Sequence, residues 1–309
     1  MVKVDAIKNF LIISRANLQL GTIPHAFLGI LLASNTVGTL FQWPILLYIL
    51  LYVILITYAC NINCYFDMNV DKLYKKNLYS ASYHLGKNKI RILIIFELLT
   101  ACVLIFFLYL SNHIITCVIA LFGVLSATIY SVPPFRVKTR GILSPIPVIV
   151  GLYSLPILGG WFLVTTTFPF YTIMFLFGYA FMNEGFTLVN TCEDYQEDKE
   201  AGIKTWAHVL GLQHTLNLSF LFSILGYLCI LALIIKTFLL SLTSNIKIIF
   251  IILLIILCFS TISISAHDIW KIMREDDKEV ASKIYAKKML QWFLITRYPL
   301  LLFALILIV

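Results

Sequence analysis

The sequence has 309 residues, of which 61% are hydrophobic and only 12% charged, and its mean hydropathy is +0.94. Soluble domains have about 45–50% apolar and about 25% charged residues, so this composition excludes a water-soluble globular enzyme and indicates one membrane-embedded unit. The net charge of +8 does not indicate a nucleic-acid partner, because basic residues in membrane proteins mainly set the orientation of the chain.

Runs of about 20 apolar residues are long enough to cross a lipid bilayer as helices. The chain has nine such runs, and we expect spans at 18–34, 43–62, 90–110, 113–130, 142–164, 169–190, 214–236, 245–265 and 291–309. The predicted fold is an all-α membrane protein, a bundle of nine transmembrane helices that forms a single domain over residues 1–309. We expect the loops at its cytoplasmic end to cap the functional site.

The connections between these spans are of two kinds. Short connections contain no lysine or arginine at 35–42, 111–112 and 165–168, and the one at 237–244 is only flanked by Lys236 and Lys247. Of the other 21 basic residues, 20 lie in the N-terminal segment, at helix borders, or in four longer loops near 63–89, 131–141, 191–213 and 266–290, and Arg297 falls within the last predicted span. The positive-inside rule therefore predicts that the N-terminus and these four loops are cytoplasmic and that the C-terminus is outside.

Two matching polar patterns stand at the ends of the second and sixth predicted helices. Both read N-x-x-x-D-x-x-x-D, with Asn63, Asp67 and Asp71 in the first and Asn190, Asp194 and Asp198 in the second. Residues four apart share one face of a helix, so each pattern presents an amide and two carboxylates along one stripe. Two facing stripes would form a cage of four carboxylates that repel one another unless a cation binds between them. Oxygen ligands of this kind suit Mg²⁺, although a single stripe is equally typical of a solvated helix end.

Basic residues near these stripes provide the opposite charge. The Pro133-Pro134 pair is expected to end the fourth helix and to hold the next residues extended. Arg136 and Lys138 would then point the same way, and we interpret them as ligands for an anion. Other loop lysines are interpreted as orientation signals, among them Lys75, Lys76, Lys87 and Lys89.

Carboxylates, Mg²⁺ and cations at the mouth of an apolar bundle suit the diphosphate ester of a long hydrocarbon. Metal ions neutralise a diphosphate and make it a better leaving group, while the hydrocarbon tail can lie between the helices. The carbon that remains is an allylic cation, which aromatic faces stabilise and a dry pocket protects from water.

The two stripes resemble the motifs of the UbiA superfamily of intramembrane prenyltransferases, which carry N-D-x-x-D-x-x-x-D after the second of nine helices and D-x-x-x-D after the sixth. Asn63, Asp67 and Asp71 match the first motif, and Asp194 and Asp198 match the second. The continuation of the second motif is also similar, at Gly202-Ile-Lys204-Thr205 and Leu210-Gly211, as is the segment Tyr130-Ser-x-Pro133-Pro134-x-Arg136-x-Lys138. The sequence departs from the family pattern at Cys64, where the family usually has aspartate.

The resemblance implies a Mg²⁺-dependent enzyme that ionises a polyprenyl diphosphate and transfers the prenyl group to an aromatic or other lipid acceptor within the bilayer. It implies that Mg²⁺ is held by Asp67, Asp71, Asp194 and Asp198 with help from Asn63 and Asn190. It implies diphosphate contacts from Lys72, Arg136, Lys138 and Lys204, and a role for Tyr130 in stabilising the cation or touching the leaving group.

Two other classes of protein remain open at this point. A terpene cyclase on the same scaffold would ionise the same donor without an acceptor, and no residue separates the two reactions. A transporter is disfavoured, because both stripes are expected at one membrane face rather than at the midplane between inverted repeats. Neither the acceptor nor the length of the prenyl chain can be predicted.

Some polar residues fall outside this scheme. Ionisable or amide side chains inside predicted spans are by default functional candidates, and here they are Glu97, Asn183 and Glu184. Arg15, before the first span, could reach the mouth of the site but is interpreted as an anchor at the lipid headgroups. The mixed pattern over 267–290 predicts an amphipathic helix at the membrane surface.

Overall fold

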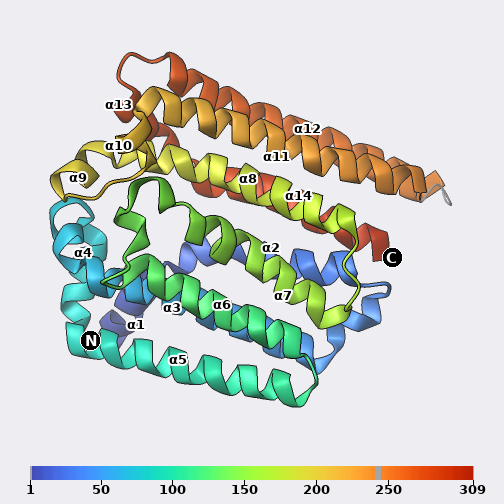
Figure 1. Cartoon of the computed structure of the whole chain (residues 1–309), viewed down its shortest axis with the longest axis horizontal. Helices are drawn as coiled ribbons and strands as arrows, with labels where there is room; N and C mark the ends of the chain where they lie inside the picture. Colours follow the sequence, from blue (N-terminus) through green and yellow to red (C-terminus); the bar gives the residue numbers. More distant parts are fainter. Residues whose placement is uncertain (1, 241–244, 309) are drawn as a thin grey trace.

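The computed structural model describes residues 2–240 and 245–308, which form an elongated bundle of roughly antiparallel helices (Figure 1). Within these residues nine segments are long and apolar enough to cross a membrane, which confirms the predicted number of spans. These segments contain α2 (Ala16–Ala33), α3 (Trp43–Tyr74), α5 (Lys87–Leu110), α6 (Ile114–Ser131), α7 (Leu155–Val164), α8 (Phe170–Glu193), α11 (Leu212–Leu240), α12 (Asn245–Arg274) and α14 (Met289–Ile308). The predicted connection 237–244 includes residues 241–244, which lie outside the described residues.

Two spanning helices are longer than the hydropathy pattern predicts. Helix α3 continues past the predicted end at residue 62 to Tyr74, so the first polar stripe is part of the helix. Helix α12 continues to Arg274. The amphipathic helix predicted over 267–290 is therefore wrong as one element, because this region contains the end of α12, a turn at 275–277 and the short helix α13 (Lys278–Ala286).

The segment between α6 and α7 is irregular. The Pro133-Pro134 pair follows the end of α6 at Ser131, as predicted, but the next residues are not extended. They form turns and two short 3₁₀ helices, η2 (Val137–Thr139) and η3 (Gly141–Leu143), and then the π-helical η4 (Val148–Ser154) leads into α7. Prolines in this stretch lack the amide donors that a regular α-helix requires.

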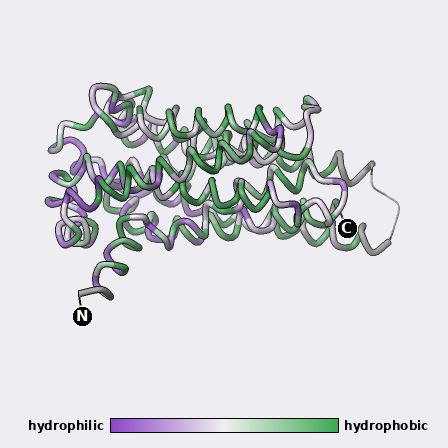
Figure 2. Tube along the Cα trace, turned by 90° about the horizontal axis from the view of Figure 1, so that it is seen from below, coloured by the Kyte–Doolittle hydropathy of each residue, from purple (hydrophilic) through white to green (hydrophobic). Residues whose placement is uncertain are grey.

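The charged connections gather at one end of the bundle. Figure 1 places α4 (Lys76–Leu85), α9 (Tyr195–Glu200), α10 (Trp206–Leu210) and α13 at that end together with the N-terminus, whereas the C-terminus lies at the other end. Hydrophilic residues concentrate there, while the body of the bundle is mainly hydrophobic (Figure 2). The remaining short helices are α1 (Val2–Ile13) at the N-terminus and η1 (Val37–Phe41) between α2 and α3.

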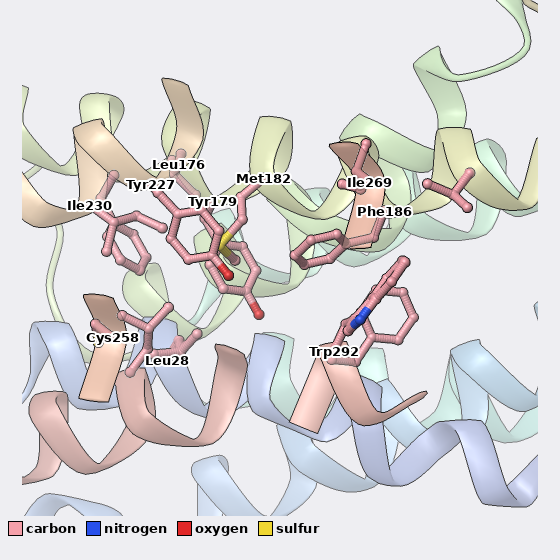
Figure 3. Close-up of a cluster of buried hydrophobic side chains, with 14 of the residues drawn as sticks. Leu28, Leu176, Tyr179, Met182, Phe186, Tyr227, Ile230, Cys258, Ile269 and Trp292 are labelled. Carbon is pink, nitrogen blue, oxygen red and sulfur yellow. The ribbon is translucent and has the colours of Figure 1, made fainter. Parts of the chain in front are cut away.

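Helix α8 is the most deeply buried span and packs directly on α11. The contact depends on glycine, because a side chain at either Gly178 or Gly226 would overlap the backbone of the opposite helix. Small residues of this kind allow membrane helices to approach closely. Around this contact, Leu176, Met182 and Phe186 of α8 pack with side chains of α2, α11, α12 and α14 (Figure 3). The core therefore fixes α8, whose last turn carries Asn190, the first residue of the second polar stripe.

Candidate active site

A cavity of about 450 Å³ lies among α2, α3, α6, η4 and α8. Its wall is polar where the two stripes lie and mainly apolar elsewhere. The apolar part is lined by Leu55, Ile56, Ile119, Ala120, Gly123, Leu152 and Leu155. The cavity therefore joins a charged region near the polar end of the bundle to a hydrocarbon-like space between the helices.

All six residues of the two stripes line this cavity. Asn63, Asp67 and Asp71 stand on α3, Asn190 on α8, Asp194 at the cap between α8 and α9, and Asp198 on α9. The structure thus brings together two segments that are far apart in the sequence.

The second stripe keeps a helical register although α8 ends within it. The Asp194 amide donates to the Asn190 carbonyl at 3.3 Å, and the Asp198 amide donates to the Asp194 carbonyl at 2.8 Å. These bonds stack the three side chains at one-turn intervals, as the four-residue spacing predicts.

Asp67 is the best-paired carboxylate in the cavity. Arg136 donates from Nη2 to Oδ1 at 2.8 Å, and Lys138 donates from Nζ to Oδ2. Asn63 joins this group when its amide is oriented to donate to Asp67 at 2.9 Å and to accept from Lys138 at 3.2 Å. Arg136 and Lys138 thus point the same way, toward one carboxylate. The predicted extended conformation is wrong, because Arg136 has a φ of 38° and Lys138 lies in a 3₁₀ turn.

The other carboxylates differ in how far they are paired. Asp194 accepts from Lys75 at 3.1 Å. Asp71 is buried, and its Oδ2 atom has no hydrogen-bond partner among the described residues. Burial, reinforced by the negative charge of Asp194, raises the pKa of Asp198 to about 7. Two of the four carboxylates therefore face the cavity without full compensation of their charge.

The four carboxylates do not close into one compact cage. Within the described part of the chain, no three histidine, cysteine, aspartate or glutamate side chains are close enough together to hold a single metal ion. Repulsion between the carboxylates accounts for this arrangement, since Asp67 and Asp194 are instead paired with basic side chains. The donor set still fits Mg²⁺, which prefers a few carboxylates together with waters and phosphate oxygens to an all-protein cage.

The basic residues do not all lie where the sequence indicated. Lys138 is buried in the cavity wall, and this burial lowers its pKa despite the opposing effect of Asp67. Lys72 and Lys204 are exposed, and neither is among the described residues that line the cavity. The backbone of Lys204 has a different role, because its carbonyl accepts the Gly141 amide at 2.8 Å and so ties the two loops together.

Two cavity residues were misinterpreted from the sequence. Lys75, read as an orientation signal, lines the cavity and pairs with Asp194. The signal was present, because Lys75 follows Asp71 by four residues and so continues the first stripe by one turn. Arg15, read as a headgroup anchor, also lines the cavity, from the turn between α1 and α2 where its φ is 49°.

Tyr130 lies on the cavity wall near the end of α6, with Lys138 Nζ 6.0 Å from the centre of its ring. Its position between the charged and apolar parts of the wall suits contact with a cation formed at the end of a hydrocarbon chain.

Glu97, a predicted functional candidate, accepts a hydrogen bond from Asn61 at 2.6 Å between α5 and α3.

Comparison with known proteins identifies the fold. A family model described as the UbiA prenyltransferase family matches residues 22–295. The solved structure of a UbiA homologue from Archaeoglobus fulgidus bound to GPP and Mg²⁺ has a TM-score of 0.73 at 18% identity and covers 97% of this chain and 99% of that chain. A structure of digeranylgeranylglyceryl phosphate synthase has a TM-score of 0.64 at 19% identity, with the same shares covered. These similarities show a common fold.

A curated relative gives a further comparison. 2-Acylphloroglucinol 4-prenyltransferase of Humulus lupulus is 27% identical over 212 residues, which make up 62% of this chain and 50% of the relative. The chain therefore spans about half the length of this relative.

Proposed function

The chain belongs to the UbiA prenyltransferase family, and on this basis we propose that it is a Mg²⁺-dependent intramembrane prenyltransferase. Its donor is a polyprenyl diphosphate, and its acceptor is an aromatic compound or another lipid precursor. The bond between C1 of the prenyl group and the diphosphate oxygen breaks, and its electron pair leaves with the diphosphate. An acceptor atom then bonds to C1 and gives up a proton.

The observation that carries this proposal is that both stripes line the polar end of a cavity whose remaining wall is mainly apolar. A prenyl diphosphate has the same division, with a charged end and a hydrocarbon tail. In support, related structures are described as bound to GPP and Mg²⁺ and to DMAPP and Mg²⁺.

Mg²⁺ would be held by the oxygen atoms of the two stripes, at Asn63, Asp67, Asp71, Asn190, Asp194 and Asp198. The unpartnered oxygen of Asp71 and the raised pKa of Asp198 support this assignment, because both carboxylates lack a full counter-charge. When bound, the metal supplies positive charge to the diphosphate as it leaves.

Basic residues beside the two stripes would bind the phosphate oxygens. Arg136, Lys138 and Lys75 already face the stripes, where they pair with Asp67 and Asp194. Charge-assisted hydrogen bonds from these side chains orient the diphosphate and stabilise its growing charge. Lys72 and Lys204 belong to the exposed rim, where their part in diphosphate binding depends on a change of side-chain position.

The apolar wall and Tyr130 would act on the other half of the donor. The apolar side chains hold the tail and exclude water from the allylic cation. The Tyr130 ring lies beside the charged wall, and its face stabilises positive charge at C1.

We further propose that the N-terminus and the four charged loops lie in the cytoplasm and that the C-terminus lies outside. The collection of these loops at one end of the bundle supports this orientation (Figure 1), since an excess of lysine and arginine marks cytoplasmic loops.

The proposal is tested by measuring diphosphate release from GPP or longer prenyl diphosphates with the purified protein in detergent, with Mg²⁺ or with a chelator. Asp67→Asn and Asp194→Asn keep the side-chain shape and should abolish release, whereas Asp276→Asn, at an exposed turn, should not change it. Wild-type turnover in either site variant would contradict the proposed role of these aspartates. A cyclic hydrocarbon formed without an acceptor would identify a terpene cyclase. Absence of Mg²⁺-dependent diphosphate release with every donor would favour the alternative that the protein is a transporter.

A further inference from the structure

A second polar cluster lies deeper in the bundle, around Arg297 of α14. The side chain is 1% exposed. Its Nε donates to Asn183 Oδ1 on α8 at 2.7 Å, and its Nη1 donates to the Gly21 carbonyl on α2. The guanidinium also stacks on Phe293, with Cζ 3.6 Å from the centre of that ring. Three spanning helices therefore position one buried positive charge.

The guanidinium has no ion-pair partner within salt-bridge distance in the described part of the chain, although the buried Glu184 follows Asn183 in α8. No aspartate or glutamate of the described ranges forms an ion pair with Arg297, and its Nη2 has no hydrogen-bond partner there. An unpaired charge in a membrane interior is strongly unfavourable, and such residues usually serve a function. An anionic ligand would supply both the missing charge and the missing hydrogen-bond acceptor.

His25 of α2 adds a second unpartnered atom to the cluster. The ring is fully buried, and its Nδ1 shares a hydrogen bond of 2.7 Å with the Tyr179 hydroxyl. His25 Nε2 has no hydrogen-bond partner in the described part of the chain.

Tyr153 connects this cluster to the cavity. Its ring lies in the cavity wall and makes an edge contact with His25, at 5.5 Å between ring centres. Arg297 Cζ lies 5.8 Å from the centre of the same ring. Phe293, on which Arg297 stacks, lines the cavity as well. The side chains of Tyr153 and Phe293 thus lie between the cluster and the cavity of the proposed active site.

The depth of the cluster separates it from the diphosphate end. Asn183 lies about two helical turns, or about 10 Å, before Asn190 in α8. The cluster therefore stands beside the part of the cavity where the prenyl carbon and the acceptor would meet, rather than beside the phosphates. Tyr153 also belongs to the π-helical η4, a conformation that is frequent at functional sites.

We propose that Arg297 and His25 form the subsite for an ionised oxygen of the acceptor, either a carboxylate or the phenolate of an acidic phenol. This assignment rests on the proposed prenyltransferase function. Binding of the anion at Arg297 Nη2 requires the Tyr153 ring to move aside from its present position. The subsite would then select acceptors by charge at a point distant from the Mg²⁺ ligands.

The test compares matched probes on the wild-type protein in detergent. Binding of 2,4-dihydroxybenzoate is compared with that of its methyl ester, and binding of an acylphloroglucinol with that of its O-methyl ether. We expect at least one ionised probe to bind about tenfold or more tightly than its neutral partner. Equal affinity within both pairs overturns the proposal and requires no variant.

Two substitutions then locate the effect. Arg297→Gln should reduce the preference for the ionised probe to about one, whereas Arg274→Gln, which removes an exposed arginine from α12, should preserve it. Arg297→Lys keeps the charge and is expected to keep part of the preference, which provides a readout if the glutamine variant does not fold. A full preference in Arg297→Gln overturns the proposal.

Donor chemistry is measured separately in the same samples. Mg²⁺-dependent binding of GPP is followed as a thermal shift in the wild type and in each variant, and Arg274→Gln should give the same shift as the wild type. Loss of this shift in the wild type itself would refute the proposed function, whereas a normal shift with unchanged probe preference in the variant would refute only the acceptor subsite.

Discussion

Lys75 gives the sharpest test of the arrangement at the cavity mouth. Its ammonium lies 3.1 Å from Asp194, with 44% of its side chain exposed. An ion pair this exposed contributes at most about 1 kcal/mol to stability, so Lys75→Met should leave thermal unfolding almost unchanged. A charge-assisted hydrogen bond to a bound phosphate is worth about 1.5–3 kcal/mol. Because about 1.4 kcal/mol corresponds to a factor of ten, we expect the KM for the prenyl diphosphate to rise about 10- to 100-fold.

The neighbouring lysine provides the matched control. Lys76 is exposed and is not among the described residues that line the cavity, so Lys76→Met removes the same charge from the same loop. Steady-state diphosphate release and thermal unfolding are measured for both variants, and Lys75→Arg should restore part of the affinity. Equal KM values for the two methionine variants would show that Lys75 serves only orientation and would refute the reasoning.

Three further predictions concern the metal, the helix core and the cation. Asp71→Asn should remove most of the thermal stabilisation that Mg²⁺ and GPP together give in scanning fluorimetry, since a carboxylate ligand is lost; an unchanged shift would contradict its role. Gly226→Leu would overlap Gly178 across the contact of α8 and α11 and should destabilise the fold by about 1–3 kcal/mol or more. Gly38→Leu, where a Cβ would make only an ordinary contact with Thr36, should be neutral in the same unfolding assay. Tyr130→Leu should lower kcat about 5- to 30-fold, the kinetic equivalent of about 1–2 kcal/mol of cation–π stabilisation. Tyr130→Phe keeps the ring and should retain most of the rate. Equal kcat values for the leucine variant and the wild type would exclude this role of the ring.

The number of spans was predictable because it depends on local composition alone. A run of about 20 apolar residues in a bilayer forms a helix, because only a helix satisfies all of its backbone hydrogen bonds within the segment. The pairing of the two polar stripes could also be anticipated, since a four-residue spacing fixes a helix face before any tertiary contact forms. The end of α3 was less predictable. Its last turns, through Tyr74, are helical but polar, so a hydropathy pattern places the end of the helix too early.

The roles of individual cations could not be read from the sequence. Lys72 and Lys75 are three residues apart, but only one of them reaches the cavity among the described residues. The turn that brings Arg136 and Lys138 to Asp67 depends on backbone angles that Pro133-Pro134 does not specify. Arg297 was overlooked although it stands inside the last predicted span, where a lone arginine is itself a signal. Its partners come from α2 and α8, and no local pattern reveals contacts at that sequence separation.

The pairing of Asp67 with Arg136 and Lys138 has a thermodynamic consequence for donor binding. In the proposed reaction, Mg²⁺ alone must compete with Arg136 and Lys138 for Asp67, and diphosphate alone must compete with Asp67 for the same two side chains. When both ligands bind, Asp67 would bind the metal, and Arg136 and Lys138 would bind the phosphates. One set of ion pairs is then exchanged for another with little net change in buried charge. Each ligand therefore raises the affinity for the other by the same factor. In the proposed reaction these ion pairs would weaken the binding of Mg²⁺ alone and of diphosphate alone, and would favour the two ligands binding together.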